Sequence, residues 1–190
     1  MVQKQSTARI HLRILLLMSL FIALSIVFGK FLAFNVGEMI RISFENLPII
    51  FAAITLGPLA GATVGIAADL LGCLLVGYAI NPIITVGAAA IGLLAGIVAH
   101  LTRKIPLSLH IVLTVLVSHL IGSVLVKTAG LAAFYGVSYP ILMLWRALNY
   151  LIVGTAEGIL LFILLKSVVS DALARLLGRH TERTDTKNDL

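Results

Sequence analysis

Long apolar runs, joined by short polar connections, make up most of this sequence. A helix needs about 20 mainly apolar residues to cross a bilayer, and four runs reach that length: 12–32, 58–76, 82–101 and 107–133. A fifth run, 141–165, is similar in length but contains charged residues, and run 47–56 is roughly half as long as a full span. The pattern predicts an all-α integral membrane protein, a compact six-transmembrane-helix bundle whose second helix is short or tilted.

The composition agrees with lipid as the solvent for most of the chain. Of its 190 residues, 60% are hydrophobic and 12% are charged, whereas a soluble domain carries about 25% charged residues. A water-soluble fold of this size leaves much of its surface exposed and could not bury so much apolar area. The net charge of +6 does not indicate nucleic-acid binding, because the basic residues flank the apolar runs rather than forming one stripe.

The placement of charge predicts how the chain lies in the membrane. Six crossings put both termini and the connection at 103–104 on one side, and the basic residues collect there: Lys4, Arg9, Arg13, Arg103, Lys104, Lys166, Arg175, Arg179, Arg183 and Lys187. By the positive-inside rule, this side is cytoplasmic. We therefore expect a cytoplasmic N-terminus at 1–11, a membrane domain at 12–170 and a cytoplasmic polar tail at 171–190, in the cell (plasma) membrane. The first apolar run is too long for a signal peptide, so we expect it to remain as a helix.

The connections between the runs carry further information. Gly57-Pro58 leaves almost no loop between the second and third helices, which are therefore expected to be antiparallel neighbours. The longest connection, 35–46, alternates apolar and polar residues over 39–44, which is typical of a short extended strand. Another outward connection, 77–81, is much shorter.

Small residues recur at four-residue spacing along several of the predicted helices. Such faces let helix backbones approach closely, which drives helix association in membranes. Most of them are expected to serve packing within the bundle: Gly57, Gly61, Gly65, Ala68, Gly72, Ala88, Gly92, Gly96, Gly154 and Gly158. The face formed by Ser19 and Ala23 on the first helix has two interpretations, internal packing or docking of a partner membrane protein.

Ionisable groups inside a membrane are costly, so each one is a functional candidate by default. Asp69, His119 and Glu157 fall within apolar runs, and we interpret them mainly as structural groups that fix or couple helices. Glu157 lies about three turns beyond Arg146 on the same helix, which is too far for a direct pair.

Four residues in the last apolar run form the strongest binding candidate: Trp145, Arg146, Asn149 and Tyr150. They lie in the outer half of their helix, where Lys127 and Asn81 can converge on them. An indole that stacks on a flat ring, cations for carboxylates and an amide for ring edges suit a heteroaromatic, anionic metabolite. The alternative is that Trp145 and Arg146 only anchor the helix at the membrane interface.

The sequence lacks the motifs of an enzyme or of a transporter that powers itself. It contains no G-x-x-x-x-G-K-[ST] loop, so the chain cannot drive transport with its own ATP hydrolysis, and no H-E-x-x-H or G-x-S-x-G motif. Cys73 is the only cysteine, which excludes disulfide frameworks and cysteine-rich metal sites. We therefore expect no enzyme activity, no cofactor and no metal.

A family resemblance rests on five segments: Arg41-Ile-Ser-Phe-Glu-Asn-Leu-Pro-Ile-Ile, Thr55-Leu-Gly-Pro-Leu-Ala-Gly-Ala, Gly65-Ile-Ala-Ala-Asp-Leu-Leu-Gly, Asn81-Pro-Ile-Ile-Thr and Arg146-Ala-Leu-Asn149. Together they resemble the substrate-binding S components of energy-coupling factor (ECF) vitamin transporters, specifically the folate-type branch. The resemblance covers residues 10–170. It implies a six-helix membrane protein that binds one vitamin near the outer face and works with a transmembrane coupling subunit and two cytoplasmic ATPases.

The resemblance also implies roles for individual residues. The connections after the first and third helices form a lid over the site in this family, and here they carry Arg41, Tyr78 and Asn81. In the family, the S component is thought to topple in the membrane to deliver its cargo, and it docks through small residues on the first helix. By position, that docking role falls on Ser19 and Ala23.

The cargo is left open by one departure from the family pattern. The connection at 77–81 is shorter than in folate-type members, which allows thiamine, hydroxymethylpyrimidine or another pterin-like compound in place of folate. Two functions of other classes also stay open, an intramembrane enzyme that uses Asp69 or Glu157 and a structural membrane subunit. The leading hypothesis is high-affinity capture of folate or a related heteroaromatic vitamin, delivered through a shared energising module.

Overall fold

The computed structural model describes residues 2–36 and 40–167, and the tail expected at 171–190 lies outside them. Helices and two short strands follow one another along the chain: α1 (Val2–Ile26), the π-helix η1 (Val27–Phe31), β1 (Phe34–Val36), β2 (Ile40–Ile42), α2 (Asn46–Leu56), α3 (Pro58–Val76), α4 (Pro82–Thr102), α5 (Leu107–Ser118), the π-helix η2 (His119–Lys127), α6 (Thr128–Tyr135) and α7 (Tyr139–Lys166). Because α5, η2 and α6 are continuous, they form a single long helical segment.

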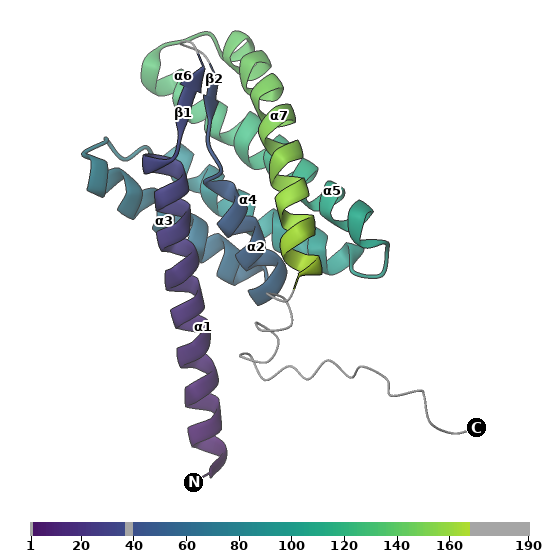
Figure 1. The fold of residues 1–190 in the computed structure, drawn as a ribbon. Coiled ribbons are helices and arrows are strands. Elements are labelled where there is room, and N and C mark those ends of the chain that lie inside the picture. Colours follow the sequence, from purple (N-terminus) through teal and green to yellow (C-terminus); the bar gives the residue numbers. More distant parts are fainter. Residues whose placement is uncertain (1, 37–39, 168–190) are drawn as a thin grey trace.

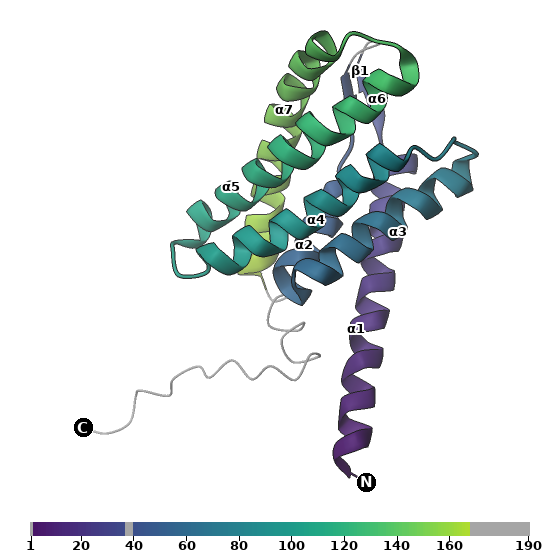
Figure 2. The same ribbon diagram turned by 180° about the vertical axis from the view of Figure 1, so that it is seen from behind.

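The helices have the lengths that a membrane bundle requires. Within the described residues, five helical segments are long and apolar enough to cross a membrane: Ile10–Phe31, Pro58–Val76, Pro82–Thr102, Leu107–Tyr135 and Tyr139–Lys166. The remaining apolar helix, α2, is shorter, as its sequence predicts. The prediction of an all-α membrane bundle is therefore confirmed, with the helices packed side by side in Figures 1 and 2.

A small β-hairpin covers one end of the bundle. β1 and β2 pair antiparallel, with Asn35 opposite Arg41. The expected strand at 39–44 is present as Ile40–Ile42, whereas its partner, Phe34–Val36, was not predicted because those residues directly follow the apolar run of the first helix. In Figure 1 the hairpin lies beside α6 and the first turns of α7, which places the connection after the first helix over this end of the molecule.

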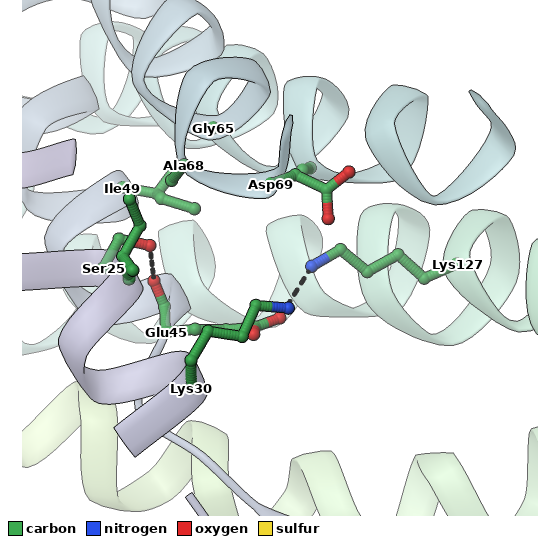
Figure 3. Close-up of a pocket in the computed structure, with 10 residues that line it drawn as sticks. Ser25, Lys30, Glu45, Ile49, Gly65, Ala68, Asp69 and Lys127 are labelled. Carbon is green, nitrogen blue, oxygen red and sulfur yellow. Dashed lines mark hydrogen bonds and ion pairs between the residues drawn. The ribbon is translucent and has the colours of Figure 1, made fainter. Parts of the chain in front are cut away.

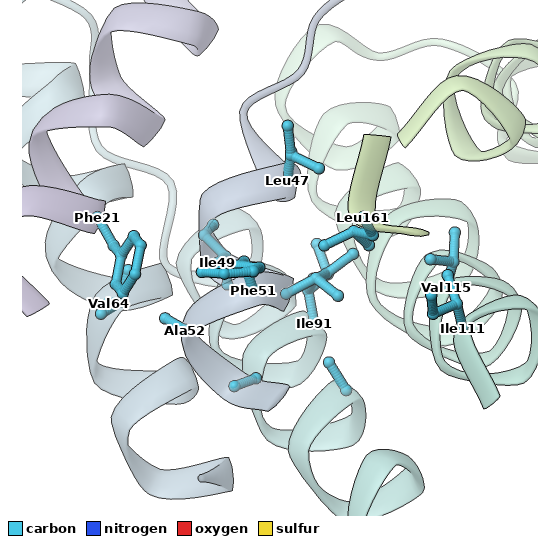
Figure 4. Packing of buried hydrophobic residues seen from close by; sticks show 13 residues of the cluster. Phe21, Leu47, Ile49, Phe51, Ala52, Val64, Ile91, Ile111, Val115 and Leu161 are labelled. Atoms are coloured by element: carbon cyan, nitrogen blue, oxygen red, sulfur yellow. The ribbon is translucent and has the colours of Figure 1, made fainter. Parts of the chain in front are cut away.

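The short helix α2 lies at the centre of the molecule. It is apolar around its whole circumference, and its residues from Asn46 to Ala53 are buried, as expected for a helix without a solvent-facing side. Side chains from four other helices surround it in Figure 4: Phe21, Val64, Ile91 and Leu161. The rings of Phe21 and Phe51 meet edge to face at 5.6 Å between centroids. The helix that is too short for an ordinary span is therefore the core of the bundle.

Close backbone contact joins α3 to α4. A Cβ atom added to Gly92 would overlap the backbone of Gly61, and one added to Gly65 would overlap the backbone of Ala88. Small residues at these positions remove the side-chain layer that normally separates two helices, which agrees with their predicted packing role. α3 begins at Pro58 directly after Gly57, whose φ of 106° lets the chain reverse from α2 with no loop.

Gly158 does not have the packing role expected for it. A Cβ atom built on Gly158 meets nothing within 4 Å, whereas one on Gly154 meets Cδ2 of His119 at 3.4 Å. The expectation failed because the four-residue spacing identifies a small-residue face but does not reveal whether another helix lies against it.

Gly92→Ala is expected to lower the unfolding temperature of the detergent-purified protein, because the added methyl group overlaps the backbone of Gly61. Forcing extra atoms into a packed contact costs about 1–3 kcal/mol. Gly158→Ala is the matched control, since it adds the same group to α7 where nothing lies within 4 Å. The control should be neutral or stabilising by roughly 0.5–1 kcal/mol, because alanine is the better helix former. Equal destabilisation in both variants would contradict the packing argument.

Candidate functional site

An ion pair lies beneath the hairpin and joins two distant parts of the chain. Nζ of Lys127, at the end of η2, donates to Oε1 of Glu45 at 2.9 Å, although the two residues are 82 positions apart. The Lys127 side chain is buried, and that of Glu45 is partly exposed. Figure 3 shows the pair as the central contact of a cluster that also contains Lys30 and Asp69.

The neighbours of this ion pair hold it in place. Oγ of Ser25 donates to the backbone oxygen of Glu45 at 2.7 Å, and Oγ1 of Thr85 donates to Oδ2 of Asp69 at 2.6 Å. Lys30, Asp69 and Lys127 line the same small cavity, whose volume is about 20 Å³. A cavity of this size holds about one water molecule. In this conformation the cluster therefore closes the interior of the bundle.

The charge of Glu45 is set by its basic neighbours. Burial alone would raise the pKa of this carboxyl, but the Lys127 ammonium, with further contributions from Lys30 and Arg41, lowers the pKa from 4.5 to about 2. Glu45 is therefore ionised over the whole physiological pH range, and it neutralises the buried Lys127.

The predicted binding cluster on α7 is tied to the hairpin and to η2. Nδ2 of Asn149 donates to the backbone oxygen of Arg41 at 2.9 Å. An Arg146 guanidinium nitrogen donates to the backbone oxygen of Ser123 at 3.2 Å and lies 3.3 Å from the Tyr150 hydroxyl. These bonds bring together residues that the sequence placed in one site, from α7 and from the outer connection.

Two side chains of this cluster keep unused bonding capacity. Among the described residues, Oδ1 of Asn149 and Nε of Arg146 are buried without a hydrogen-bond partner, and both amide atoms of Asn46 at the start of α2 share this condition. Buried polar atoms are almost always paired with protein, water or a ligand. The acceptor on Asn149 and the donor on Arg146 can therefore recognise the edge of a polar ring.

His119 and Glu157 form a second buried pair below the α7 cluster. Nε2 of His119 lies 2.6 Å from Oε2 of Glu157, and Nδ1 lies 3.1 Å from Oγ of Ser123. The His119 ring also stacks on Tyr150, with 4.8 Å between centroids. These contacts agree with the structural interpretation of both residues and couple η2 to α7.

Asn81 and Tyr78 make their contacts away from this cluster, whereas Trp145 directly precedes Arg146 within it. Asn81 caps α4, since its Oδ1 accepts from the Ile83 amide at 3.0 Å, and its Nδ2 donates to the backbone oxygen of Gly130 at 2.9 Å. Tyr78 is largely exposed, with its ring centroid 5.5 Å from Nζ of Lys30. Trp145 is 38% exposed on the same helix as the cluster. Asn81 therefore has a structural role, while Tyr78 and Trp145 are accessible to a ligand.

The two predicted docking residues are accessible on α1. Ser19 and Ala23 are both exposed, and the Ser19 hydroxyl is bonded only within its own helix, to the backbone oxygen of Leu15 at 3.0 Å. The N-terminal half of α1 projects beyond the other helices in Figures 1 and 2. Of their two interpretations, internal packing does not apply at these positions.

Glu45 is the principal site residue that sequence reasoning missed. A signal was present, because Glu45 is an acidic residue immediately before the wholly apolar helix α2. A carboxylate that enters an apolar interior needs a cation close by, and Lys127 was the available candidate. Within the described residues, no group of three or more His, Cys, Asp or Glu side chains is arranged to hold a metal ion.

Glu45→Gln is expected to destabilise the protein by about 3–5 kcal/mol, because it leaves the buried Lys127 ammonium without its counter-charge. The control is the double variant Glu45→Gln with Lys127→Met, which removes both charges and should recover most of the loss. Thermal unfolding in detergent measures both. In the unmodified protein, the ion pair's contribution to the free energy of unfolding is fully present above pH 4.5, the pKa of Glu45 in the unfolded chain. It is lost as the pH falls toward 2, the pKa of Glu45 in the folded protein. No recovery in the double variant would contradict the pairing.

Comparison with known proteins extends over most of the chain. The family model for the ECF transporter, substrate-specific component, matches residues 13–175. No curated protein sequence matches the chain.

Two solved structures share the fold. FolT bound with folic acid is 24% identical, with a TM-score of 0.65, and the match covers 79% of this chain and 90% of FolT. ThiT from Listeria monocytogenes is 22% identical, with a TM-score of 0.66, and covers 86% of this chain and 97% of ThiT. At these identities the two structures establish the fold, and the family match covers the six-helix bundle with its hairpin and α7 cluster. The chain belongs to the substrate-specific components of ECF transporters.

Proposed function

We propose that this protein captures folate or a closely related heteroaromatic vitamin at the hairpin end of the bundle. The observation that carries the proposal is the pair of buried, unpartnered atoms, Oδ1 of Asn149 and Nε of Arg146, beside the hairpin. An acceptor and a donor held on one helix face suit the edge of a pterin-like ring. The partly exposed Trp145 adds an aromatic surface on which such a ring can stack.

Charge favours an anionic cargo over a cationic one. The described residues at this end include four basic side chains and two acidic ones: Lys30, Arg41, Lys127, Arg146, Glu45 and Asp69. Glu45 is already neutralised by Lys127, so it is not free to bind a positive ring such as that of thiamine. A surplus of positive charge attracts carboxylates. Folate-like compounds therefore rank above thiamine and hydroxymethylpyrimidine, which stay as alternatives.

The hairpin acts as a lid in this proposal. It is linked to α7 by the bond from Nδ2 of Asn149 to the backbone oxygen of Arg41, at 2.9 Å. A cargo that bonds to the same amide can hold the hairpin closed over itself. FolT, which was solved with folic acid, and ThiT share this fold at similar identity, so the preference for a folate-like cargo rests on the charge distribution at this end.

The proposed orientation places the hairpin end outside the cell and both termini in the cytoplasm. At the opposite end, the described basic residues are Arg13, Arg103, Lys104 and Lys166, which is the distribution that the positive-inside rule predicts. The chain would then work with a transmembrane coupling subunit and two cytoplasmic ATPases, and its exposed α1 face at Ser19 and Ala23 would dock the coupling subunit.

Asn149→Ala and Arg146→Ala are each expected to weaken vitamin binding at least tenfold, or about 1.4 kcal/mol, because each removes a buried bonding atom. Fluorescence titration with folate, thiamine and related vitamins measures this, since Trp145 is the only tryptophan in the chain. The control is Ile152→Ala, an exposed position on the same helix, which should bind normally. Unchanged affinity in both cluster variants would overturn the site, and a response to thiamine alone would overturn the preferred cargo.

Ala23→Leu is expected to reduce association with the coupling subunit while vitamin affinity stays unchanged, because a bulky side chain prevents close approach of a partner helix to α1. Co-purification of the complete transporter measures the association. The control is Ala133→Leu, which adds the same bulk at an exposed position on α6 and should retain the complex. Normal assembly of the Ala23 variant would show that the partner docks elsewhere.

A further inference from the structure

A long groove separates α5 and η2 from α7, on the outer surface of the bundle. Its volume is about 510 Å³, and its walls include Leu116 and Leu120 on one side and Leu151 and Ile159 on the other. All four side chains are more than half exposed. The groove meets the α7 cluster at Tyr150 and otherwise runs away from it along α7. The proposed function assigns no role to the groove.

The floor of this groove, which we call the α5–α7 groove, is formed by small and neutral groups. Gly154 and Gly158 line it, and the space beside Gly158 is empty to 4 Å. Three of its four polar side chains are engaged elsewhere, since Thr155 donates to the Leu151 backbone oxygen at 2.6 Å, His119 pairs with Glu157 and the Tyr150 hydroxyl accepts from Arg146. The fourth, Ser108, lies at the end of the groove next to the α4–α5 turn. The groove therefore presents hydrocarbon to whatever fills it.

The length of the groove suits a lipid tail. From Ser108 to Val124 the lining residues span sixteen steps of about 1.5 Å, or roughly 24 Å. One leaflet contributes only about half of a 30 Å hydrocarbon core, so the groove can take an acyl chain along its full length. A helix about 10 Å across and of the same length needs roughly 1,900 Å³, several times the volume of the groove.

One end of the groove is basic. Phe162 lines it at this end, and Nζ of Lys166 lies 5.5 Å from the centroid of the Phe162 ring. Ser108 lines the facing wall, only a few residues after the exposed Arg103 and Lys104 in the turn between α4 and α5. Within the described residues, none of these three cations has a carboxylate partner. Figures 1 and 2 place this turn and the end of α7 at the same end of the bundle.

We propose that the α5–α7 groove binds one anionic phospholipid, with an acyl chain along the groove and the phosphate near Lys104 and Lys166. Two observations support this occupant independently, the apolar groove of matching length and the cations at one of its ends, which have no carboxylate partner among residues 2–36 and 40–167. An anionic headgroup near the membrane surface is attracted by each lysine or arginine close to it. The bound lipid covers the helix face that α5 and α7 leave open, and it leaves α1 free.

The test uses the full chain in nanodiscs that contain phosphatidylglycerol and phosphatidylcholine in equal amounts. After transfer to detergent, native mass spectrometry counts the lipids that stay bound. The unmodified protein is expected to retain one phosphatidylglycerol at least fivefold more often than phosphatidylcholine. Lys104→Gln with Lys166→Gln should bring the two lipids close to parity, because the phosphate then loses its cations.

Gly158→Leu places a side chain in the groove and should abolish retention of the lipid, whereas Leu160→Phe, outside the groove on the same helix, should not. Thermal unfolding verifies that both variants fold. A phosphatidylglycerol with a photoreactive acyl chain gives a measurement that needs no variant, and it should label α5 and α7 in preference to α3. No retained lipid, equal retention of both lipids by the unmodified protein, or labelling spread evenly over the helices would overturn the proposal. Crosslinking of the groove to a second copy or to the coupling subunit would also overturn it.

Discussion

Buried charge is the constraint on which the rest of this structure depends. A lipid-embedded bundle has no water in its interior to solvate an ion, so each buried charge needs a partner supplied by the protein. Glu45 meets Lys127 across 82 positions of sequence, and His119 meets Glu157 across 38. Each pair fixes the relative position of two elements that the hydrophobic effect alone would let slide, because an apolar surface packs against lipid and against another helix almost equally well.

Both pairs involve the π-helix η2, which connects them to the candidate site. His119, Ser123 and Lys127 follow one another along this segment at four-residue steps. His119 and Ser123 bond to α7, and Lys127 bonds to Glu45 immediately before α2. A π-helix sacrifices ideal backbone geometry, and such segments often occur at functional positions. The α7 cluster contacts η2 directly, since Arg146 donates to the Ser123 backbone oxygen and Tyr150 stacks on His119. A change at the hairpin is therefore transmitted to the middle of the bundle through few contacts.

The sequence was sufficient to predict where the helices begin and end, but it was insufficient to predict which side chains meet between them. Run 58–76 was predicted to the residue, because glycine and proline at its start and glycine after its end mark the boundaries that the structure has. The pairing of Glu45 with Lys127 was not predicted, because it depends on how α2 and η2 are placed in three dimensions. Gly158 shows the same limit, since the spacing that correctly places Gly92 against Gly61 gives no sign that Gly158 faces an open groove.

Three surfaces of the bundle thus meet three different environments. The hairpin end collects polar atoms and suits a water-soluble cargo, α1 projects with an exposed small-residue face, and the α5–α7 groove offers hydrocarbon on another side. Delivery of the proposed cargo by movement of the bundle would require the cargo to stay enclosed while the lipid contacts change. Both pairs lie largely inside the bundle, since the side chains of Lys127, His119 and Glu157 are buried, whereas that of Glu45 is partly exposed. Internal pairing and the groove therefore meet at His119, which bonds to Glu157 inside the bundle and also lines the α5–α7 groove.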